Sequence, residues 1–78
     1  IFRLNQGTAV TESEGKTMEK AYVFLADGFE EIEGLTVVDI LRRAGADTQT
    51  VSVMGRKEIT GSHRITLQAD LVFEETSF

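Results

Sequence analysis

The sequence predicts an α/β fold centred on one βαβ unit, for three reasons. Residues Ala21–Leu25 are apolar without alternation, as expected of a strand that is covered on both faces. Residues Glu30–Ala44 follow with the apolar spacing of an amphipathic helix. Residues Asp47–Val53 then alternate as a second strand. This order within about thirty residues implies a parallel pair of strands with a right-handed connection.

The first strand ends in a tight turn at Asp27, Gly28 and Phe29, and the helix begins directly after it. In open α/β sheets, ligands and chemistry gather at this carboxyl edge of the strands. A glutamate one turn into the helix is therefore a candidate site residue.

The predicted helix has one broad apolar face, which we expect to be buried. Acidic residues at its start and Arg42 and Arg43 at its end complement the helix dipole. Gly45 supplies the left-handed position that closes the helix. The apolar stripe consists of Ile32, Leu35, Val38 and Leu41 at a spacing of three, widened by Val37, Ile40 and Ala44.

After the second strand, the chain is predicted to make a polar excursion over Gly55–Leu67. It contains a short extended piece at Ile59 and Thr60, a turn at Gly61 and Ser62, and a short strand over Ile65–Leu67. Residues Ala69–Phe73 lead onward, and Glu74 and Glu75 are expected to open a helix.

Composition limits the function classes. The chain has 78 residues, a formal net charge of −5, scattered basic residues and no cysteine, which argues against nucleic-acid binding and excludes disulfides. No segment is long enough to span a membrane, and no cofactor or metal-ligand cluster is expected. A core this small rarely supplies more than a few kcal/mol, so we expect the chain alone to be marginally stable.

Residues 18–75 resemble the amino-terminal third of the ThiJ/PfpI superfamily, which comprises flavodoxin-like α/β proteins such as a parkinsonism-associated deglycase and its bacterial relatives. The resemblance lies in the run KAYVFLADGFEEIEGLTVVDILRRAGADTQTVSVMG and in the later run TGSHRITLQADLVFEE. Its elements are the strand before Asp27-Gly28, the Glu-Glu-Ile-Glu opening, Asp39, Arg42-Arg43-Ala44-Gly45, the Gly61-Ser62 turn and Ala69-Asp70.

The resemblance implies that residues 18–78 are the amino-terminal part of an incomplete ThiJ/PfpI-like domain. Proteins of this family carry a nucleophilic cysteine on a strand-to-helix elbow downstream of the region present here. Residues 1–17 are expected to be a flexible or non-native extension, since they show no period and no signal peptide. Met18 stands where family members begin, so these residues are either an upstream extension, or a disordered tail or a preceding strand from a fused partner.

For function, the resemblance implies a cysteine-dependent enzyme of the deglycase, glyoxalase or amidase type acting on a small carbonyl or amide substrate. The full-length protein is expected to be a cytoplasmic homodimer whose interface includes the Glu30–Ala44 helix and the Gly61–Leu67 excursion. The alternative is a non-catalytic flavodoxin-like stress-response chaperone or regulatory module. A flavin- or nucleotide-binding function is disfavoured because the turn at Ala26–Phe29 lacks a glycine-rich phosphate loop.

Three carboxylates open the helix: Glu30, Glu31 and Glu33. From the residues alone, each is an ordinary partner of the helix dipole, worth about 0.3–1 kcal/mol. The resemblance implies a catalytic role for Glu33, because the family keeps a glutamate there whose carboxyl group hydrogen-bonds the nucleophilic thiol. It places Glu30 near the subunit boundary, opposite a basic residue of the other subunit, and we expect Glu31 at the surface.

Two basic residues are candidates for the interface or pocket. His63 is a lone histidine in a polar turn, which predicts an exposed side chain. The resemblance aligns it with an arginine that in several relatives reaches the partner subunit's pocket, and Arg64 is adjacent. The family's catalytic histidine follows the missing cysteine, so His63 does not take that role. Arg43, near the helix end, is expected to be a dipole partner rather than a ligand clamp.

Overall fold

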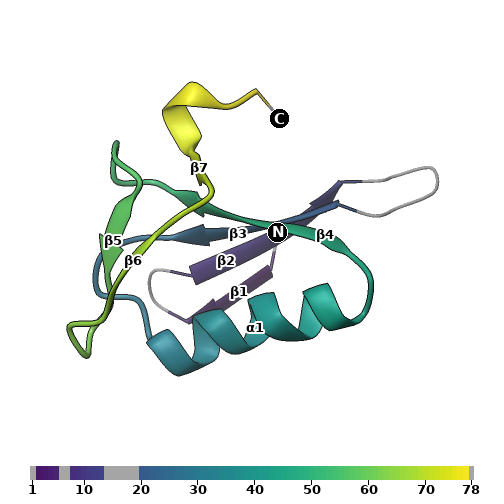
Figure 1. Cartoon of the computed structure of the whole chain (residues 1–78), viewed down its shortest axis with the longest axis horizontal. Coiled ribbons are helices and arrows are strands. Elements are labelled where there is room, and N and C mark those ends of the chain that lie inside the picture. The colour runs from purple at the N-terminus through teal and green to yellow at the C-terminus, as the bar shows by residue number, and fades with distance from the viewer. Residues whose placement is uncertain (1, 6–7, 14–19, 78) are drawn as a thin grey trace.

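The computed structural model describes residues 2–5, 8–13 and 20–77, which form two sheets and one α-helix (Figure 1). The larger sheet has five strands in the order β1-β2-β3-β4-β7, and the smaller one pairs β5 with β6. The elements are β1 (Phe2–Asn5), β2 (Thr8–Ser13), β3 (Lys20–Leu25), α1 (Glu31–Arg43), β4 (Asp47–Ser52), β5 (Glu58–Thr60), β6 (Thr66–Gln68), β7 (Leu71–Val72) and the 3-10 helix η1 (Phe73–Glu75).

The predicted βαβ unit is confirmed. β3 and β4 are parallel and pair without interruption from Lys20 opposite Asp47 to Leu25 opposite Ser52. α1 connects them and lies across one face of the larger sheet (Figure 1). The turn before α1 has Gly28 at φ +88°, and the helix is followed by Gly45 at φ +92°, so both glycines take left-handed backbone conformations. The α/β fold class is therefore confirmed.

The core lies between α1, β3 and the smaller sheet of β5 and β6. Val23 and Leu25 of β3 are fully buried and share an apolar cluster with Val38 of α1, Phe29 and Ile59. The prediction of one broad buried helix face is wrong at its margins, because Ile32 is 75% exposed and Ile40 57% exposed. A single sheet face covers only part of the circumference of α1, so a wider apolar stripe extends beyond the contact.

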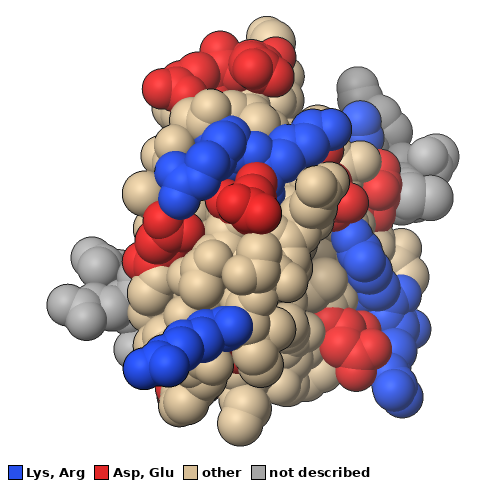
Figure 2. Space-filling model, turned by 60° about the vertical axis from the view of Figure 1, so that its left-hand side comes forward, with Lys and Arg blue, Asp and Glu red and all other residues tan. Residues whose placement is uncertain are grey.

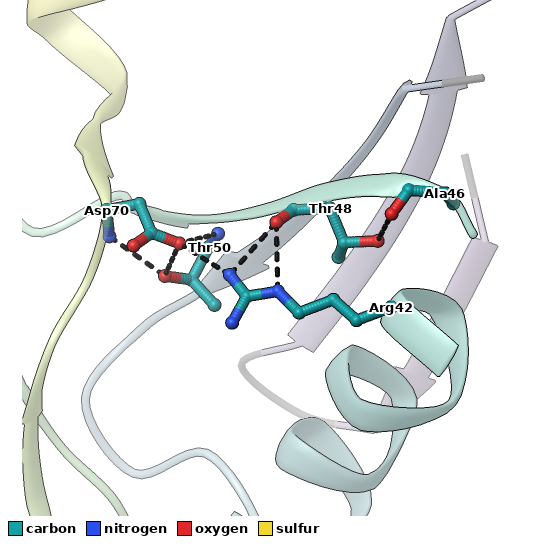
Figure 3. A network of polar contacts seen from close by, with 5 residues as sticks. All are labelled: Arg42, Ala46, Thr48, Thr50 and Asp70. Atoms are coloured by element: carbon teal, nitrogen blue, oxygen red, sulfur yellow. Dashed lines mark hydrogen bonds and ion pairs between the residues drawn. The ribbon is translucent and has the colours of Figure 1, made fainter. Parts of the chain in front are cut away.

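A polar network joins the end of α1 to β4 and β7 (Figure 3). Arg42 of α1 donates through Nε and Nη2 to the Thr48 carbonyl oxygen at 3.1 and 2.9 Å. Its Nη2 also contacts Asp70 Oδ2 at 3.0 Å. The same Asp70 oxygen accepts the Thr50 N–H at 2.9 Å and the Thr50 hydroxyl at 3.0 Å. These contacts satisfy backbone groups of β4 just before its pairing with β7 begins at Val51.

The later elements follow the predicted order with shifted boundaries. β5 and β6 form the predicted excursion, with Ile59 opposite Leu67. β4 ends at Ser52 rather than Val53, and the expected helix at Glu74 and Glu75 is a single 3-10 turn. The sequence predicted no pairing for β7, which adds a short parallel strand outside β4.

The segment before the family-like region contains two strands. β2 pairs antiparallel with β3 from Thr8 opposite Leu25 to Ser13 opposite Lys20, and β1 pairs antiparallel with β2. Sequence patterning predicted no regular element in residues 1–17 except as a preceding strand from a fused partner. Met18 lies outside the described residues, so its place at the start of the family-like region stays a prediction.

Candidate functional site

The loop between β5 and β6 is fastened to the amino-terminal end of α1 by one carboxylate. Glu31 is only 4% exposed, and its Oε2 accepts the His63 N–H at 2.8 Å and the Ile65 N–H at 3.3 Å. Its Oε1 lies 2.8 Å from His63 Nδ1 and 3.5 Å from the Ser62 hydroxyl. We refer to the contacts between Glu31 and residues 61–65 as the Glu31 latch.

The expectation that Glu31 lies at the surface is therefore wrong. The buried carboxylate accepts hydrogen bonds from N–H groups of a loop more than thirty residues later in the chain, where an exposed carboxylate would bind water. No local sequence pattern reveals this pairing. The sequence contained one indication of this contact, the glycine at position 61. A β-carbon at that position would overlap the Glu31 side chain, so the turn needs glycine to approach the carboxylate.

The contact between Glu31 and His63 also shifts the pKa values of both residues. Burial raises the pKa of Glu31, but the hydrogen bonds from the His63 side chain and from the N–H groups of Glu31, His63 and Ile65 outweigh burial and lower it to about 2. The hydrogen bond to Glu31, together with the charges of Glu30 and Glu31, raises the pKa of His63 above its ordinary 6.5. The pair is therefore an ion pair at mildly acidic pH.

His63 is exposed, as the sequence predicted, but it is not free. Its side chain is 64% exposed, and Nδ1 lies 3.6 Å from Glu30 Oε1 in addition to its contact with Glu31. Glu30 is the N-cap of α1, where its Oε1 accepts the Ile32 N–H at 3.2 Å. The structure thus brings Glu30, Glu31 and His63 of one chain together.

These three side chains carry atoms of the kind that bind metal ions, all within 4.8 Å of one another. Both oxygens of Glu31, however, already accept hydrogen bonds from the loop. A cation would have to displace the contact between Glu31 and His63, so the arrangement is better suited to holding the loop than to holding a metal.

Glu33 has a different environment. It lies in the first turn of α1, is exposed, and lines a shallow apolar depression with Ile32, Thr36 and Val37. Within residues 20–77, no hydrogen bond or ion pair engages its side chain. Of the three carboxylates, Glu33 is the one with neither oxygen engaged by a hydrogen bond or ion pair of the described residues.

Arg43 is not part of this group. It pairs with Asp39 through Nε at 3.0 and 3.1 Å in the last turn of α1. Ten residues separate it from Glu33, which corresponds to about 15 Å along the helix. Its position and pairing agree with the dipole-partner interpretation.

Sequence patterning predicted no role for the charged residue Asp27 beyond a turn. Its Oδ1 accepts the Thr60 N–H at 3.0 Å, and its Oδ2 pairs with Arg56 at 2.5 Å. The hydrogen bond from the Thr60 backbone, helped by Arg56, holds the pKa of Asp27 below its usual value. Asp27 therefore ties the carboxyl end of β3 to β5.

Acidic and basic side chains are interspersed on the face shown in Figure 2. That face presents no single basic patch of the kind that phosphate groups require. Within the described residues, no helix combines the length and apolar character needed to cross a membrane.

Comparison with known proteins agrees with this fold. Residues 19–77 match the DJ-1/PfpI family, and the chain belongs to that family. It is 33% identical over 82 residues to protein DJ-1 homolog B of Arabidopsis thaliana and 38% identical over 53 residues to protein DJ-1 homolog A of the same plant. These matches cover 96% and 68% of this chain.

A solved structure is also similar. A cysteine-to-alanine mutant of a DJ-1 superfamily protein from Salmonella typhimurium matches 67% of this chain with a TM-score of 0.64 and 36% identity. The matches cover only 19% and 14% of the two Arabidopsis proteins and 28% of the Salmonella chain. The predicted family is therefore confirmed, and the present chain spans a small part of each relative.

Proposed function

We propose that this chain is the amino-terminal part of a cysteine-dependent DJ-1/PfpI enzyme of the deglycase, glyoxalase or amidase type. In this proposal Glu33 is the carboxyl group that contacts the nucleophilic thiol of the complete domain. The observation that supports this proposal is that the three carboxylates have different environments. Glu31 is engaged by the loop, Glu30 caps α1, and Glu33 remains exposed beside an apolar depression.

The position of Glu33 suits that role. It follows the carboxyl end of β3, the edge at which open α/β sheets place their ligands. A carboxyl group enclosed there would have its pKa raised by desolvation, and a neighbouring thiolate would raise it further. The protonated form could then donate a hydrogen bond to the thiolate and lower the pKa of the cysteine.

Assays with methylglyoxal and an activated ester test the proposal. The chain itself has no thiol, so we expect no saturable turnover from it. We expect turnover from the complete polypeptide, and its loss on replacing the elbow cysteine with alanine. Turnover by the present chain, or undiminished turnover without that cysteine, would contradict the proposal.

The second candidate is a non-catalytic stress-response chaperone or regulatory module. The exposed apolar side chains of Ile32 and Ile40 on α1 favour it, because they offer surface for an unfolded client. Suppression of client aggregation that survives loss of the cysteine would support this alternative. We further propose that the complete protein is a cytoplasmic homodimer acting on a small carbonyl or amide compound, without nucleic-acid or membrane partners.

A further inference from the structure

β3 is the strand at the centre of the larger sheet, and it has a neighbour at each edge. On one side it pairs in parallel with β4. On the other side it pairs antiparallel with β2 through six consecutive residue pairs, from Thr8 opposite Leu25 to Ser13 opposite Lys20. In contrast to the pairing of β1 with β2, which has an irregularity between Arg3 and Asn5, this register is continuous.

The antiparallel neighbour is unexpected for this fold. A flavodoxin-like sheet has the strand order 2-1-3-4-5, so its third strand lies beside the first, on the side away from the second. In this chain β3 and β4 are the first and second strands of that order. The edge of β3 on which β2 lies is therefore the place that the third, parallel strand takes in such a sheet.

The edge of β3 that faces away from β4 would expose unpaired backbone groups if no strand lay beside it. Ala21, Val23 and Leu25 of β3 are fully buried, so the strand has no exposed side chains at these positions that would discourage further pairing. Its unpaired N–H and C=O groups would form a template for any extended segment within reach.

We propose that the edge of β3 facing away from β4 is a strand-acceptor site, occupied here by residues 8–13 in place of the parallel strand of a complete sheet. One edge pairs with one strand, so residues 8–13 and that parallel strand exclude each other. The inference uses the family fold on which the proposed function rests, but it requires no thiol and no catalysis.

The double variant Val10→Pro/Thr11→Pro tests which segment occupies the β3 edge that faces away from β4. Neighbouring residues of a strand direct their N–H groups to opposite sides, so one of the two prolines removes a hydrogen bond to β3 whichever residue donates it. Val10→Ala with Thr11→Ala retains both N–H groups and is the matched control.

Amide hydrogen exchange of residues 21–25 is the first readout, because alternate amides of β3 point to β2 and to β4. In the proline variant we expect at least about tenfold faster exchange of the amides directed at β2, with those directed at β4 unchanged. Equal protection of the β2-directed amides in the proline variant and in the control would overturn the assignment of residues 8–13 as the occupant.

Binding of a fluorescent peptide of residues 1–17 is the second readout. We expect saturable one-to-one binding to the proline variant, at least about tenfold weaker binding to the original chain, and renewed protection of the β2-directed amides. A scrambled peptide is the control. Equal binding to both chains, no binding to the proline variant, or equal binding of the scrambled peptide would overturn the strand-acceptor site. None of these outcomes depends on enzymatic activity, so they are separate from a failure of the proposed function.

Discussion

Gly61 and the Glu31 side chain are packed so closely that a β-carbon at position 61 would overlap the carboxylate. Glycine therefore sets the distance at which the β5–β6 loop can present its N–H groups to Glu31. The Glu31 latch therefore depends on both the absence of a side chain at Gly61 and the buried charge of Glu31.

Gly61→Ala is expected to destabilise the chain by about 1–3 kcal/mol, the usual cost of forcing an extra methyl group into a packed site. Urea denaturation measures the change in the free energy of unfolding. The double variant Glu31→Ala/Gly61→Ala is the informative control, because removing the carboxylate removes the overlap. We expect its cost to be smaller than the sum of the two single costs, and additive costs would contradict the close packing.

Stability should depend on pH through the latch. The pKa of Glu31 is lowered to about 2 from an ordinary 4.5, so its stabilising effect is complete above about 4.5 and is lost as pH falls towards 2. The pKa of His63 is raised above 6.5, so its effect is complete below 6.5 and is lost as pH rises through the raised value. The latch should therefore stabilise most between pH 4.5 and 6.5.

Thermal denaturation across this pH range, in the original chain and in His63→Gln, tests the alkaline side. The variant should lose the fall in melting temperature above pH 6.5 while keeping the fall below pH 4.5. The interpretation fails if the original chain and the variant have the same pH profile.

Two Asp–Arg pairs at the end of α1 are expected to differ in energy. Asp70 contacts Arg42 and also accepts two hydrogen bonds from Thr50, whereas Asp39 pairs with Arg43 in an exposed contact between neighbouring turns. Asp70→Ala should cost about 1–3 kcal/mol because it leaves the Thr50 N–H without its partner. Asp39→Ala should cost less than about 1 kcal/mol, as exposed pairs do. Equal costs in urea denaturation would show that the network in Figure 3 adds no more stability than the exposed pair of Asp39 and Arg43.

The central βαβ unit could be predicted because its signals are local. The apolar run of β3, the turn at Gly28 and the helix closure at Gly45 each depend on neighbouring residues, and the structure keeps all three. The position of Glu31 could not be predicted in this way. Its partners come from a loop more than thirty residues later, and an acidic residue in a first helical turn is ordinarily exposed.

The same reasoning explains the other differences. The exposure of Ile32 and Ile40 depends on which part of α1 faces the sheet, not on apolar spacing. The pairing of β2 with β3 joins a polar segment to an apolar strand through backbone hydrogen bonds, which leave little trace in composition.

The proposed homodimer can be tested through α1. Ile32 is 75% exposed and lines a depression together with Ile65 of the β5–β6 loop, so both segments of the expected interface meet there. In the complete protein, Ile32→Asp should shift sedimentation from dimer towards monomer by at least about tenfold in dissociation constant, because it places a charge in a buried contact. Val53→Asp changes another exposed apolar residue outside these segments and should leave the dimer intact. A monomeric original protein at micromolar concentration would rule out the interface.

The thiolate absorbance of the complete polypeptide, titrated with pH, tests the role of Glu33 most directly. Replacing Glu33 with leucine removes the proposed donor, so the pKa of the cysteine should rise by roughly one unit or more, corresponding to ~1.4 kcal/mol per unit. Glu30→Gln is the matched control, since Glu30 caps the same helix and should leave the thiol pKa nearly unchanged. An unchanged or lower thiol pKa in folded Glu33→Leu would show that Glu33 is an ordinary helix-start carboxylate.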